Sequence, residues 1–582
     1  MADVRPRPAD VISDVRFPGE STPIMKRRAS EPFLLRSDGC LLYPEVGRKS
    51  DIAQPGGFRR QALGMPHKSE SFKPFPISCR QSMMLSLSMG VIPPHVFEKL
   101  KPTPGTKTPL IVYVLSGFAS ISGMLFGYDT GIVSGAMLLI NNDFHLEHEP
   151  VKSEMIVSAT VLFAIVGSVL GGPLNSRVGR KKSTLIASIL FAVGAAGFSF
   201  SSTTTELIVL RSVLGVAVGL ASQGTPMYVA ETAPAHLRGA LTSSFNFSIN
   251  CGQVIACVVA GSLCHVPEGW RWMMTLAGVP AVVQFVGMLF LPESPRWFAE
   301  KGRREEALAV LVKLRKDPHK ARVELDYILA ELDVYSQQTA STTKASMVAF
   351  RKELLLGCGL LGIQAFTGIN TVMYYSSSIL KMAGMGESQA IWGAVLPAFG
   401  NASVAGFSML IVERTGRRSI ALFSLFWIAV TLVLMSLSFH VQHTPALHGY
   451  GGICVLVCMM GYIVAFAIGM SPVPWIVNSE IYPLQYRSVG TSAATMLNWT
   501  SNFIVSMTFL SVCKAIQPEG AFLLYAGVSL FGFFFVYFLL PETGGKTLEE
   551  VQALFEPRPP KFDVSCASEP LLRPQVRAGI QV

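Results

Sequence analysis

The chain has 582 residues, of which 50% are hydrophobic and 15% are charged. An ordinary soluble domain carries about 25% charged residues, so this composition excludes that class and indicates a polytopic membrane protein. The formal net charge of +10 would suit nucleic-acid binding if the cations formed one patch. They lie instead in short loops between apolar stretches, which indicates membrane topology and no nucleic-acid partner.

The first 105 residues are rich in Pro, Ser and Arg, and they do not begin with a signal sequence. This composition predicts a disordered cytosolic tail. Arg27 and Arg28 precede Ser30 and indicate a phosphorylation site at that serine. The segment Glu31-Pro-Phe-Leu-Leu35 loosely resembles a dileucine signal, which predicts sorting adaptors as partners of the tail. Motifs this short also occur by chance.

Apolar segments of about 20 residues follow the tail, and each is long enough to cross ~30 Å of hydrocarbon as a helix. We expect twelve spans in a lipid bilayer, and therefore an all-α membrane protein. Their expected ranges are 110–140, 156–174, 183–202, 206–229, 241–263, 272–291, 353–378, 390–412, 418–439, 452–476, 488–512 and 521–540.

One carboxylate interrupts the first span, at Asp129 within Gly127-Tyr-Asp-Thr-Gly131. A charge in hydrocarbon costs several kcal/mol, so it should face the protein interior and find a partner. Arg211 is the other fixed charge well inside an expected span, and it should lie in the same half of the bilayer at ~1.5 Å of rise per residue. We expect an Asp129–Arg211 pair that marks a proton path. A static ion pair between two helices is the alternative.

The loops predict the orientation of the spans. Lys and Arg follow the even-numbered spans, for example at Arg177 to Lys182, whereas the loop 201–206 has neither residue. Loops rich in Lys and Arg remain in the cytosol, so both termini are expected there. We expect the protein in the plasma membrane, with an intracellular vesicle pool.

The one long loop, at 293–352, has a mixed-charge pattern with apolar residues three and four apart. This spacing predicts an amphipathic helical spacer on the cytosolic side. Its expected apolar face contains Leu308, Leu311, Leu314, Leu325, Ile328 and Leu332.

Three loop motifs occur twice, in the same order and after corresponding spans. Their repetition indicates duplication and predicts two six-helix halves that rock around a central site. The pairs are Arg177-x-Gly-Arg180 with Arg414-x-Gly-Arg417, Glu231-x-x-Pro-x-x-x-Arg238 with Glu480-x-x-Pro-x-x-x-Arg487, and Pro292-Glu293-Ser with Pro541-Glu542-Thr. The expected organisation is a tail over 1–105, a half over 106–292, a linker over 293–352, a half over 353–541 and a cytosolic tail over 542–582.

The repeated motifs also suit a gate, because they place acids and cations at helix ends on one face. Exposed pairs of this kind contribute about 0–1 kcal/mol each, so they can open. A bias of positive charge toward the cytosol would explain the Arg residues but not the repeated Glu and Pro. The expected gate residues are Arg177, Arg180, Glu231, Arg238, Glu293, Arg296, Glu413, Arg414, Arg417, Glu480, Arg487 and Glu542.

Over about residues 108–556, the chain resembles the sugar porters of the major facilitator superfamily, and most of all their proton-coupled myo-inositol transporters. The resemblance implies the major facilitator fold, and it implies that Asp129 and Arg211 form the proton-coupling pair. Its motifs are Gly127-Tyr-Asp-Thr-Gly131, Pro292-Glu-Ser-Pro-Arg-Trp297, Gly368-Ile-Asn-Thr-Val-Met-Tyr-Tyr-Ser376, Pro474-Trp-Ile-Val-Asn-Ser-Glu-Ile-Tyr-Pro483 and Pro541-Glu-Thr-Gly-Gly-Lys546.

A neutral polyol is bound by amides, hydroxyls and an aromatic wall rather than by unpaired charges. In the seventh span, Gln364, Asn370 and Tyr374 are spaced as on one broad helix face. For any single Asn or Gln, packing between helices is an equal alternative. The resemblance implies that these three residues bind substrate together with Asn246, Asn401, Trp475, Asn498 and Trp499.

Three positions depart from the family pattern. Ser176 stands where most members have an acid, which inositol-type members also lack. Ala365 replaces the second residue of a Gln-Gln pair, and Asn246 replaces a Gln. The last two changes weaken the case for a hexose.

We therefore expect proton-coupled symport of a small neutral polyol, with myo-inositol as the substrate. The alternatives are an uncoupled hexose or polyol uniporter and a nutrient sensor that does not transport. No expected span has two His at ligand spacing, and no glycine-rich segment is followed by Lys-Ser/Thr. No metal, no cofactor and no enzymatic activity are expected.

Overall fold

The computed structural model describes residues 108–341, 350–442, 450–482, 486–544, 546 and 548–555, all within one compact unit of the chain. These residues form helices and no strands. Eleven of the described helices are long and apolar enough to cross a membrane. The last of them contains Gln517, whose φ of 64° and ψ of 161° are not helical, directly before Pro518. This break divides it into two spans, so the twelve-span all-α fold is confirmed.

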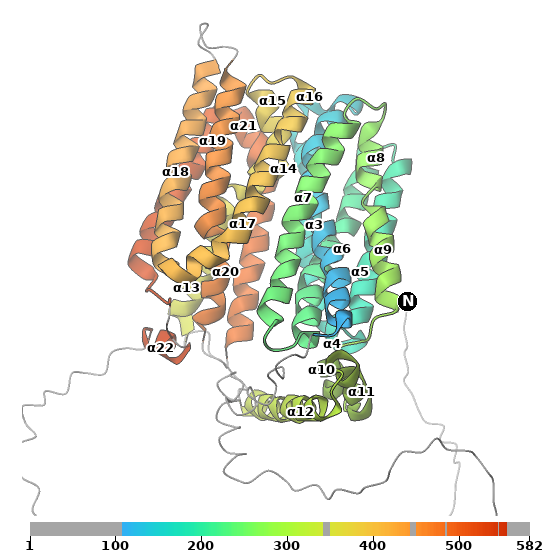
Figure 1. Ribbon diagram of the computed structural model, residues 1–582. Helices are drawn as coiled ribbons and strands as arrows, with labels where there is room; N and C mark the ends of the chain where they lie inside the picture. Colours follow the sequence, from blue (N-terminus) through green and yellow to red (C-terminus); the bar gives the residue numbers. More distant parts are fainter. Residues whose placement is uncertain are drawn as a thin grey trace, which may run out of the picture. The chain divides into compact units, whose positions relative to one another are not determined.

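The first six spans run from α3 to α9 and are coloured blue to green in Figure 1. Two short 3₁₀ turns, η1 (Leu146–His148) and η2 (Phe198–Phe200), lie in the loops. The spans are α3 (Leu110–Asp143), α4 (Pro150–Val178), α5 (Arg180–Gly197), α6 (Thr204–Thr232), α7 (Arg238–Leu263), and the pair α8 (Gly269–Thr275) and α9 (Gly278–Leu289).

Glycines allow these helices to approach closely. A Cβ at Gly127 would overlap the backbone of Ile249, so α3 and α7 touch backbone to backbone beside Asp129. A Cβ at Gly219 would overlap the backbone of Ala164, so α6 and α4 are equally close. The close approach of α3, α4, α6 and α7 buries the segment that carries Asp129.

The spans of the second part of the chain are interrupted. Gly368, with a φ of 90°, lies between two helices of the seventh span, an interruption that the sequence analysis did not predict. The elements are α13 (Arg351–Phe366), α14 (Ile369–Tyr374), α15 (Ser376–Met382), α16 (Glu387–Gly393), α17 (Val395–Thr415), α18 (Arg417–Gln442), α19 (Gly451–Ala465), the π-helical turn η4 (Phe466–Met470), α20 (Val473–Glu480) and α21 (Arg487–Leu539).

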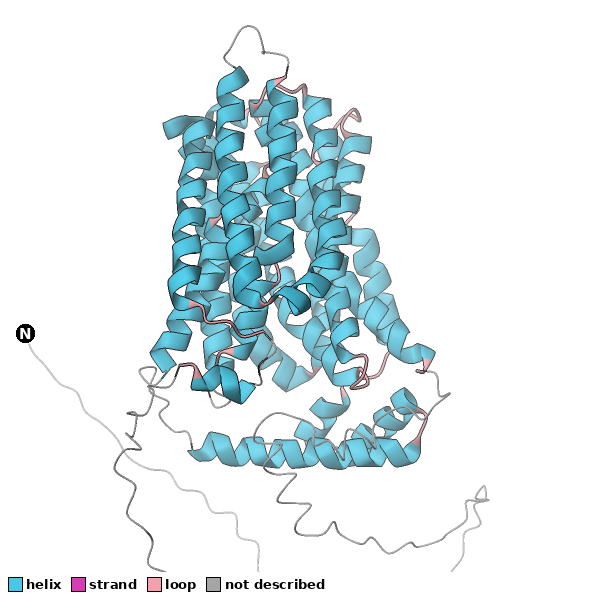
Figure 2. Cartoon of the chain, turned by 60° about the vertical axis from the view of Figure 1, so that its left-hand side comes forward, coloured by secondary structure: helices cyan, strands magenta, loops and turns pink. Residues whose placement is uncertain are grey.

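Three linker helices, α10 (Pro295–Glu300), α11 (Arg304–Arg315) and α12 (Pro318–Ser341), lie across one end of the spans (Figures 1 and 2). We call this end the linker face, and the end that carries the loop 144–149 the far face. A short helix, α22 (Leu548–Ala553), also lies at the linker face (Figure 1). Leu311, Leu325 and Ile328 are buried in one apolar cluster between the linker helices, which confirms the amphipathic prediction.

Helices α3–α9 pack mainly with one another, as do α13–α21. Several contacts between the two groups lie toward the far face. Nδ2 of Asn142 on α3 donates to Oε1 of Glu387 on α16 at 3.0 Å, and the hydroxyls of Ser134 and Ser377 are 3.1 Å apart. This packing is consistent with two six-helix halves. Their expected boundaries, 106–292 and 353–541, remain a prediction.

Candidate functional site

Asp129 and Arg211 form an ion pair enclosed by α3, α4 and α6. Nη1 of Arg211 donates to Oδ1 of Asp129, and the two side chains are only 2% and 4% exposed, respectively. Nε of Arg211 also donates to the carbonyl of Ile156 on α4 at 3.3 Å. The pairing expected from the sequence is confirmed.

The other carboxylate oxygen of Asp129, Oδ2, is buried and has no hydrogen-bond partner among the described residues. An unpaired buried oxygen is unfavourable, particularly when the group is charged. Protonation at Oδ2 would remove that charge. The geometry therefore leaves one defined position for a proton.

A small cavity of about 10 Å³ adjoins the ion pair, which is room for about one water molecule. Four of its lining residues, Phe126, Thr130, Tyr374 and Trp499, also line a much larger cavity. These four side chains form the wall between the ion pair and that larger space.

The larger cavity has a volume of about 560 Å³ and lies between the two groups of spans. This volume falls in the range of about 300–1,000 Å³ that is typical of small-molecule sites. The structure brings together all eight residues expected to bind substrate, because each one lines this cavity: Asn246 from α7, Gln364 from α13, Asn370 and Tyr374 from α14, Asn401 from α17, Trp475 from α20, and Asn498 and Trp499 from α21. Their role in binding remains a prediction.

Gln364 is fixed by the interruption of the tenth span. Its Nε2 donates to the carbonyls of Met470 at 2.7 Å and Ser471 at 3.2 Å, directly at the end of η4. Its Oε1 accepts from Nδ2 of Asn498 at 3.2 Å, and the same nitrogen donates to the carbonyl of Leu361 at 2.8 Å. Since both its amide hydrogens are engaged, Gln364 offers a ligand mainly the free lone pair of Oε1.

On the opposite wall, the amide of Asn401 reaches across to α7. Its Nδ2 donates to Oδ1 of Asn250 at 3.0 Å, and the nearby Gln253 donates through Nε2 to Oγ1 of Thr130 on α3 at 3.1 Å. This chain of polar contacts connects α17, α7 and the helix that carries Asp129.

Sequence reasoning missed Gln253 and Asn502, which also line the cavity. Asn502 donates to the hydroxyl of Tyr374 at 3.2 Å, while its own Oδ1 is buried without a partner among the described residues. Helical spacing could have found both residues. Gln253 is two turns beyond Asn246, and Asn502 is one turn beyond Asn498, on the same helix faces.

Aromatic rings complete the wall. Trp475 is 44% exposed, while the ring of Trp499 lies 5.9 Å from that of Phe126 across the boundary between the two groups of spans. Phe466 from η4 also lines the cavity. A ring with an apolar face could stack on these surfaces while its hydroxyls meet the amides.

The repeated motifs form two matching clusters at the linker face. In the first, Nη2 of Arg180 lies 2.9 Å from Oε1 of Glu231, and Glu293 accepts from the backbone nitrogens of Arg180 at 2.9 Å and Lys181 at 3.0 Å. Gly179, with a φ of 101°, precedes α5 because a Cβ there would overlap the Glu293 carboxylate. The carboxylate thereby caps the N-terminus of α5.

The second cluster has the same construction. Nη2 of Arg417 lies 3.2 Å from Oε1 of Glu480, and Glu542 accepts from the backbone nitrogens of Arg417 at 2.7 Å and Arg418 at 3.1 Å. Gly416, with a φ of 87°, leaves room for that carboxylate.

The expectation that these gate pairs are exposed is wrong. The side chains of Arg180 and Glu231 are 9% and 11% exposed, and Arg180 also lies 3.3 Å from Glu300 on α10, which helps to cover the pair. Each pair also joins helices of one group of spans. The clusters therefore hold the end of each group together.

The other expected gate residues lie at the same face outside the cluster cores. Arg296 pairs with Glu331 of α12 at 2.9 Å. Arg238 and Arg487 begin α7 and α21, and Arg177 and Arg414 are exposed near the ends of α4 and α17. The side chain of Glu413 and the whole segment around Ser30 lie outside the described residues.

Sequence reasoning also missed Glu154. The expected second span begins at 156, but α4 begins at Pro150, so this acid lies inside the helix and is 1% exposed. Its carboxylate accepts from the backbone nitrogen of Ser511 at 2.7 Å and from the Ser511 hydroxyl at 2.6 Å. Glu154 therefore connects α4 to α21 toward the far face.

Comparison with known proteins gives one consistent result. The model of the sugar (and other) transporter family matches residues 115–555. The proton myo-inositol cotransporter of Homo sapiens is 35% identical, with 78% of this chain and 83% of that protein covered, and inositol transporter 4 of Arabidopsis thaliana is 36% identical, with 77% and 93% covered. An inward-open structure of the E. coli xylose transporter XylE superimposes with a TM-score of 0.67 at 27% identity, covering 76% of this chain and all of the other. The chain therefore belongs to the sugar (and other) transporter family.

Proposed function

We propose that the protein is a proton-coupled symporter of a cyclic polyol, with myo-inositol as its substrate. The observation that carries this proposal is the shared wall between a neutral, amide-lined cavity and the buried Asp129–Arg211 pair. Two of the similar proteins bear the names proton myo-inositol cotransporter and inositol transporter, which supports both the substrate and the coupling ion.

The chemistry of the cavity supports a neutral substrate. Within the described residues, its lining contains Asn, Gln, Ser, Thr, Tyr and Trp side chains but no charged one. Burying an ionic substrate without a counter-ion would be strongly unfavourable. A polyol instead offers hydroxyls, which donate to and accept from such groups.

Coupling would act through the shared wall. When Asp129 is ionised it holds Arg211, and when it is protonated at Oδ2 the attraction between the two side chains is lost. Thr130 and Tyr374 lie between this pair and the cavity, so a change in the pair alters the surroundings of bound polyol. Loading of the proton and loading of the substrate are thereby linked.

Alternating access would use the contacts between the two groups of spans. The links from Asn142 to Glu387 and from Glu154 to Ser511 would break when the far side opens. The clusters around Arg180 and Arg417 would move with their own groups as rigid units. We assign the halves to 106–292 and 353–541, the linker face to the cytosol and the far face to the outside.

The proposal extends to the place of the protein in the cell. We assign it to the plasma membrane, with an intracellular pool controlled by the tail 1–105, in which phosphorylation of Ser30 would regulate binding of sorting adaptors. Deleting residues 1–100 should change surface abundance but not transport per surface molecule. Lower transport at equal abundance would contradict this part.

Uptake by purified protein in liposomes tests the central proposal. With an inward proton gradient, myo-inositol should accumulate above its external concentration, and a protonophore should abolish the accumulation. A uniporter would instead equalise the internal and external concentrations of myo-inositol, with or without the protonophore. A protein that binds myo-inositol without exchanging labelled substrate would be a sensor, and both outcomes would overturn symport.

A further inference from the structure

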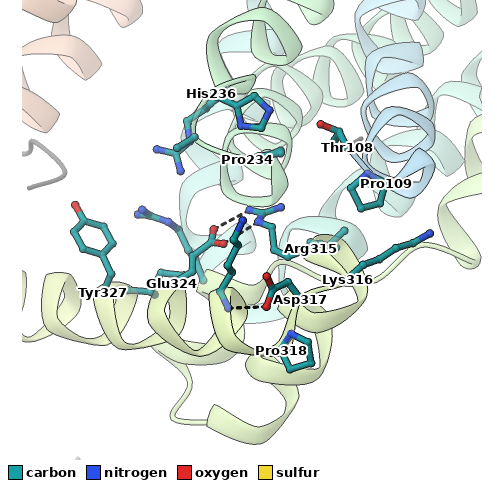
Figure 3. A pocket seen from close by; sticks show the side chains of 16 residues that line it. Thr108, Pro109, Pro234, His236, Arg315, Lys316, Asp317, Pro318, Glu324 and Tyr327 are labelled. Carbon is teal, nitrogen blue, oxygen red and sulfur yellow. Dashed lines mark hydrogen bonds and ion pairs between the residues drawn. The ribbon is translucent and has the colours of Figure 1, made fainter. Parts of the chain in front are cut away.

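The polar side chains of the central cavity are held in a different way from those of a charged site. At the linker face, a cavity of about 410 Å³ contains an acid, Glu324, that Arg315 holds with contacts of 2.7 and 2.8 Å (Figure 3). Such a pair has one possible direction, because only the guanidinium donates. The amides of the central cavity can both donate and accept, so their direction depends on the groups behind them.

One chain of hydrogen bonds beside the central cavity has a direction that the backbone determines. The hydroxyl of Thr130 donates to the carbonyl of Gly127 at 2.8 Å, and a carbonyl oxygen can only accept. Because a hydroxyl has a single hydrogen, Oγ1 of Thr130 must accept from Nε2 of Gln253, which lies 3.1 Å away. Gln253 therefore directs its nitrogen toward α3 and leaves its Oε1 for another partner.

The same constraint passes on to α17. Nδ2 of Asn401 donates to Oε1 of Gln253 at 3.5 Å and to Oδ1 of Asn250 at 3.0 Å. Both hydrogens of the Asn401 amide are thereby engaged, while its Oδ1 makes no hydrogen bond to any described residue. Asn401 lines the central cavity. The chain therefore leaves an acceptor, the amide oxygen of Asn401, for a ligand.

Asn250 contributes most to this orientation. Its contact with Asn401 at 3.0 Å has the length of a normal hydrogen bond, whereas 3.5 Å at Gln253 is long for one. Asn250 is half-buried on α7 and does not itself line the cavity. A replacement of Asn250 would remove the acceptor behind Asn401 and keep the cavity wall.

The opposite wall also presents an acceptor. Nε2 of Gln364 donates to the carbonyls of Met470 and Ser471, so its Oε1 is the atom left for a ligand. A ligand between Gln364 and Asn401 must then donate on both sides. A cyclitol has a hydroxyl on every ring carbon and can always do so, whereas a pyranose has a ring oxygen that cannot donate.

We propose that Asn250 is a positioning residue, which turns the amide oxygen of Asn401 into the central cavity and makes the site select a ligand hydroxyl that donates. This inference rests on the proposed function, in which the ligand is a cyclic polyol. Asn250 acts through Asn401 and does not touch the ligand.

Fluorinated analogues test the direction of the hydrogen bond to Asn401. Replacing one hydroxyl of myo-inositol by fluorine removes a donor and leaves an atom of similar size. Purified full-length protein would be titrated with myo-inositol and with each monodeoxyfluoro analogue. The analogue fluorinated at the hydroxyl that faces Asn401 should bind about tenfold more weakly than myo-inositol. Asn401→Ala should identify this analogue, because the variant should bind it and myo-inositol about equally.

Asn250→Leu should lower the discrimination against that same analogue by about threefold or more, because the Asn401 amide can then turn its nitrogen toward the fluorine. Discrimination against the other analogues should not change. Asn250→Asp keeps an oxygen in the same place and should retain the wild-type discrimination. Unchanged discrimination in Asn250→Leu, or an equal loss in Asn250→Asp, would overturn the proposal. If Asn250→Leu does not fold, Asn250→Ala removes the same oxygen with less volume and carries the test.

Ser244→Ala is the matched control for a lost polar contact of α7. The Ser244 hydroxyl lies 2.7 Å from that of Ser120 on α3, but Ser244 is outside both the cavity lining and the chain that orients Asn401. This variant should keep the wild-type discrimination even if its thermal unfolding temperature falls. A loss equal to that of Asn250→Leu would show that any loosening of α7 has this effect, and would overturn the role of Asn250.

The wild-type titration separates this inference from the proposed function. If the protein binds myo-inositol and every fluorinated analogue equally well, the assigned direction at Asn401 is wrong, while a polyol remains the substrate. If the protein does not bind myo-inositol, the proposed function and this inference are both overturned.

Discussion

At the residue scale, the site depends on side chains whose polar atoms are almost fully used by the protein. Arg211 donates to Asp129 and to the backbone of α4, and Gln364 donates to two carbonyls beside η4. Such contacts fix a few orientations before any ligand enters. Two of the buried atoms that remain free, Oδ2 of Asp129 and Oδ1 of Asn502, then mark where a proton and a substrate hydroxyl can be accepted.

Replacing Asp129 by Asn should separate coupling from translocation. The amide has the shape and charge of the protonated acid, so uphill accumulation and stimulation by external acid should be lost, while exchange of myo-inositol down its gradient is retained. Proteoliposomes with and without a proton gradient would show this. The loss of a counter-ion for buried Arg211 can destabilise the fold by about 3–5 kcal/mol, so rates must be normalised to folded protein. Continued accumulation against a gradient would exclude Asp129 as the coupling residue.

Gln364→Ala and Trp475→Ala should each weaken binding of myo-inositol. Loss of a buried polar contact costs about 1–3 kcal/mol, which corresponds to roughly a ten- to hundredfold higher Kd. Isothermal titration in detergent would measure it. Trp427→Ala is the control for the tryptophan, since this residue is 43% exposed outside the cavity and its loss should leave affinity unchanged. Normal binding by Gln364→Ala would show that the assignment of the seventh span is wrong.

At the element scale, the helix ends at the linker face depend on two glycines. Gly179 and Gly416 have positive φ angles, and each faces a carboxylate that caps the next helix. A residue with a Cβ would suffer both an unfavourable backbone conformation and a collision with Glu293 or Glu542. The repeated Arg-x-Gly-Arg motif is therefore explained by capping geometry as well as by charge.

Gly416→Ala should lower stability by about 1–3 kcal/mol, because of the strain of a non-glycine residue at positive φ. Gly406, ten residues earlier on α17, has open space where a Cβ would lie, so Gly406→Ala should be neutral or stabilising by about 0.5–1 kcal/mol. Thermal unfolding of the two variants in one detergent would compare them. Equal unfolding temperatures would show that position 416 does not require a glycine.

The sequence predicted the spans because each is a long apolar window, and it predicted the ion pair because charges inside such windows are rare. It predicted the cavity residues because they match motifs shared with a known family. It did not predict the interruptions at Gly368 and η4, since hydropathy is averaged over a window and is insensitive to a single turn. Gln253 and Asn502 escaped notice because isolated amides in spans are usually packing residues. Glu154 was missed for a different reason. The hydropathy of the sequence falls near Glu154, so the expected span began at 156, whereas the helix α4 begins at Pro150.

At the scale of the whole molecule, the contacts between the two groups of spans suggest which side is closed. Asn142–Glu387, Ser134–Ser377 and Glu154–Ser511 all lie toward the far face. Glu154 is the buried ionisable group among these links, and it accepts hydrogen bonds from both the backbone and the side chain of Ser511. Its removal should therefore have the largest effect on the balance between far-closed and far-open states.

Glu154→Ala should shift the protein toward states in which the far side is open. Hydrogen bonds to a charged group contribute about 1.5–3 kcal/mol each, so the loss of two should change the ratio of far-closed to far-open states by at least tenfold. Hydrogen–deuterium exchange would then accelerate around 150–158 and 507–516 and slow around the loop between α6 and α7, because the linker side closes as the far side opens. Glu147→Ala is the matched control, since Glu147 is an exposed acid on the same face and its loss should change neither segment. Faster exchange at both ends would indicate simple unfolding, and unchanged exchange would show that the Glu154–Ser511 contact does not hold the far side closed.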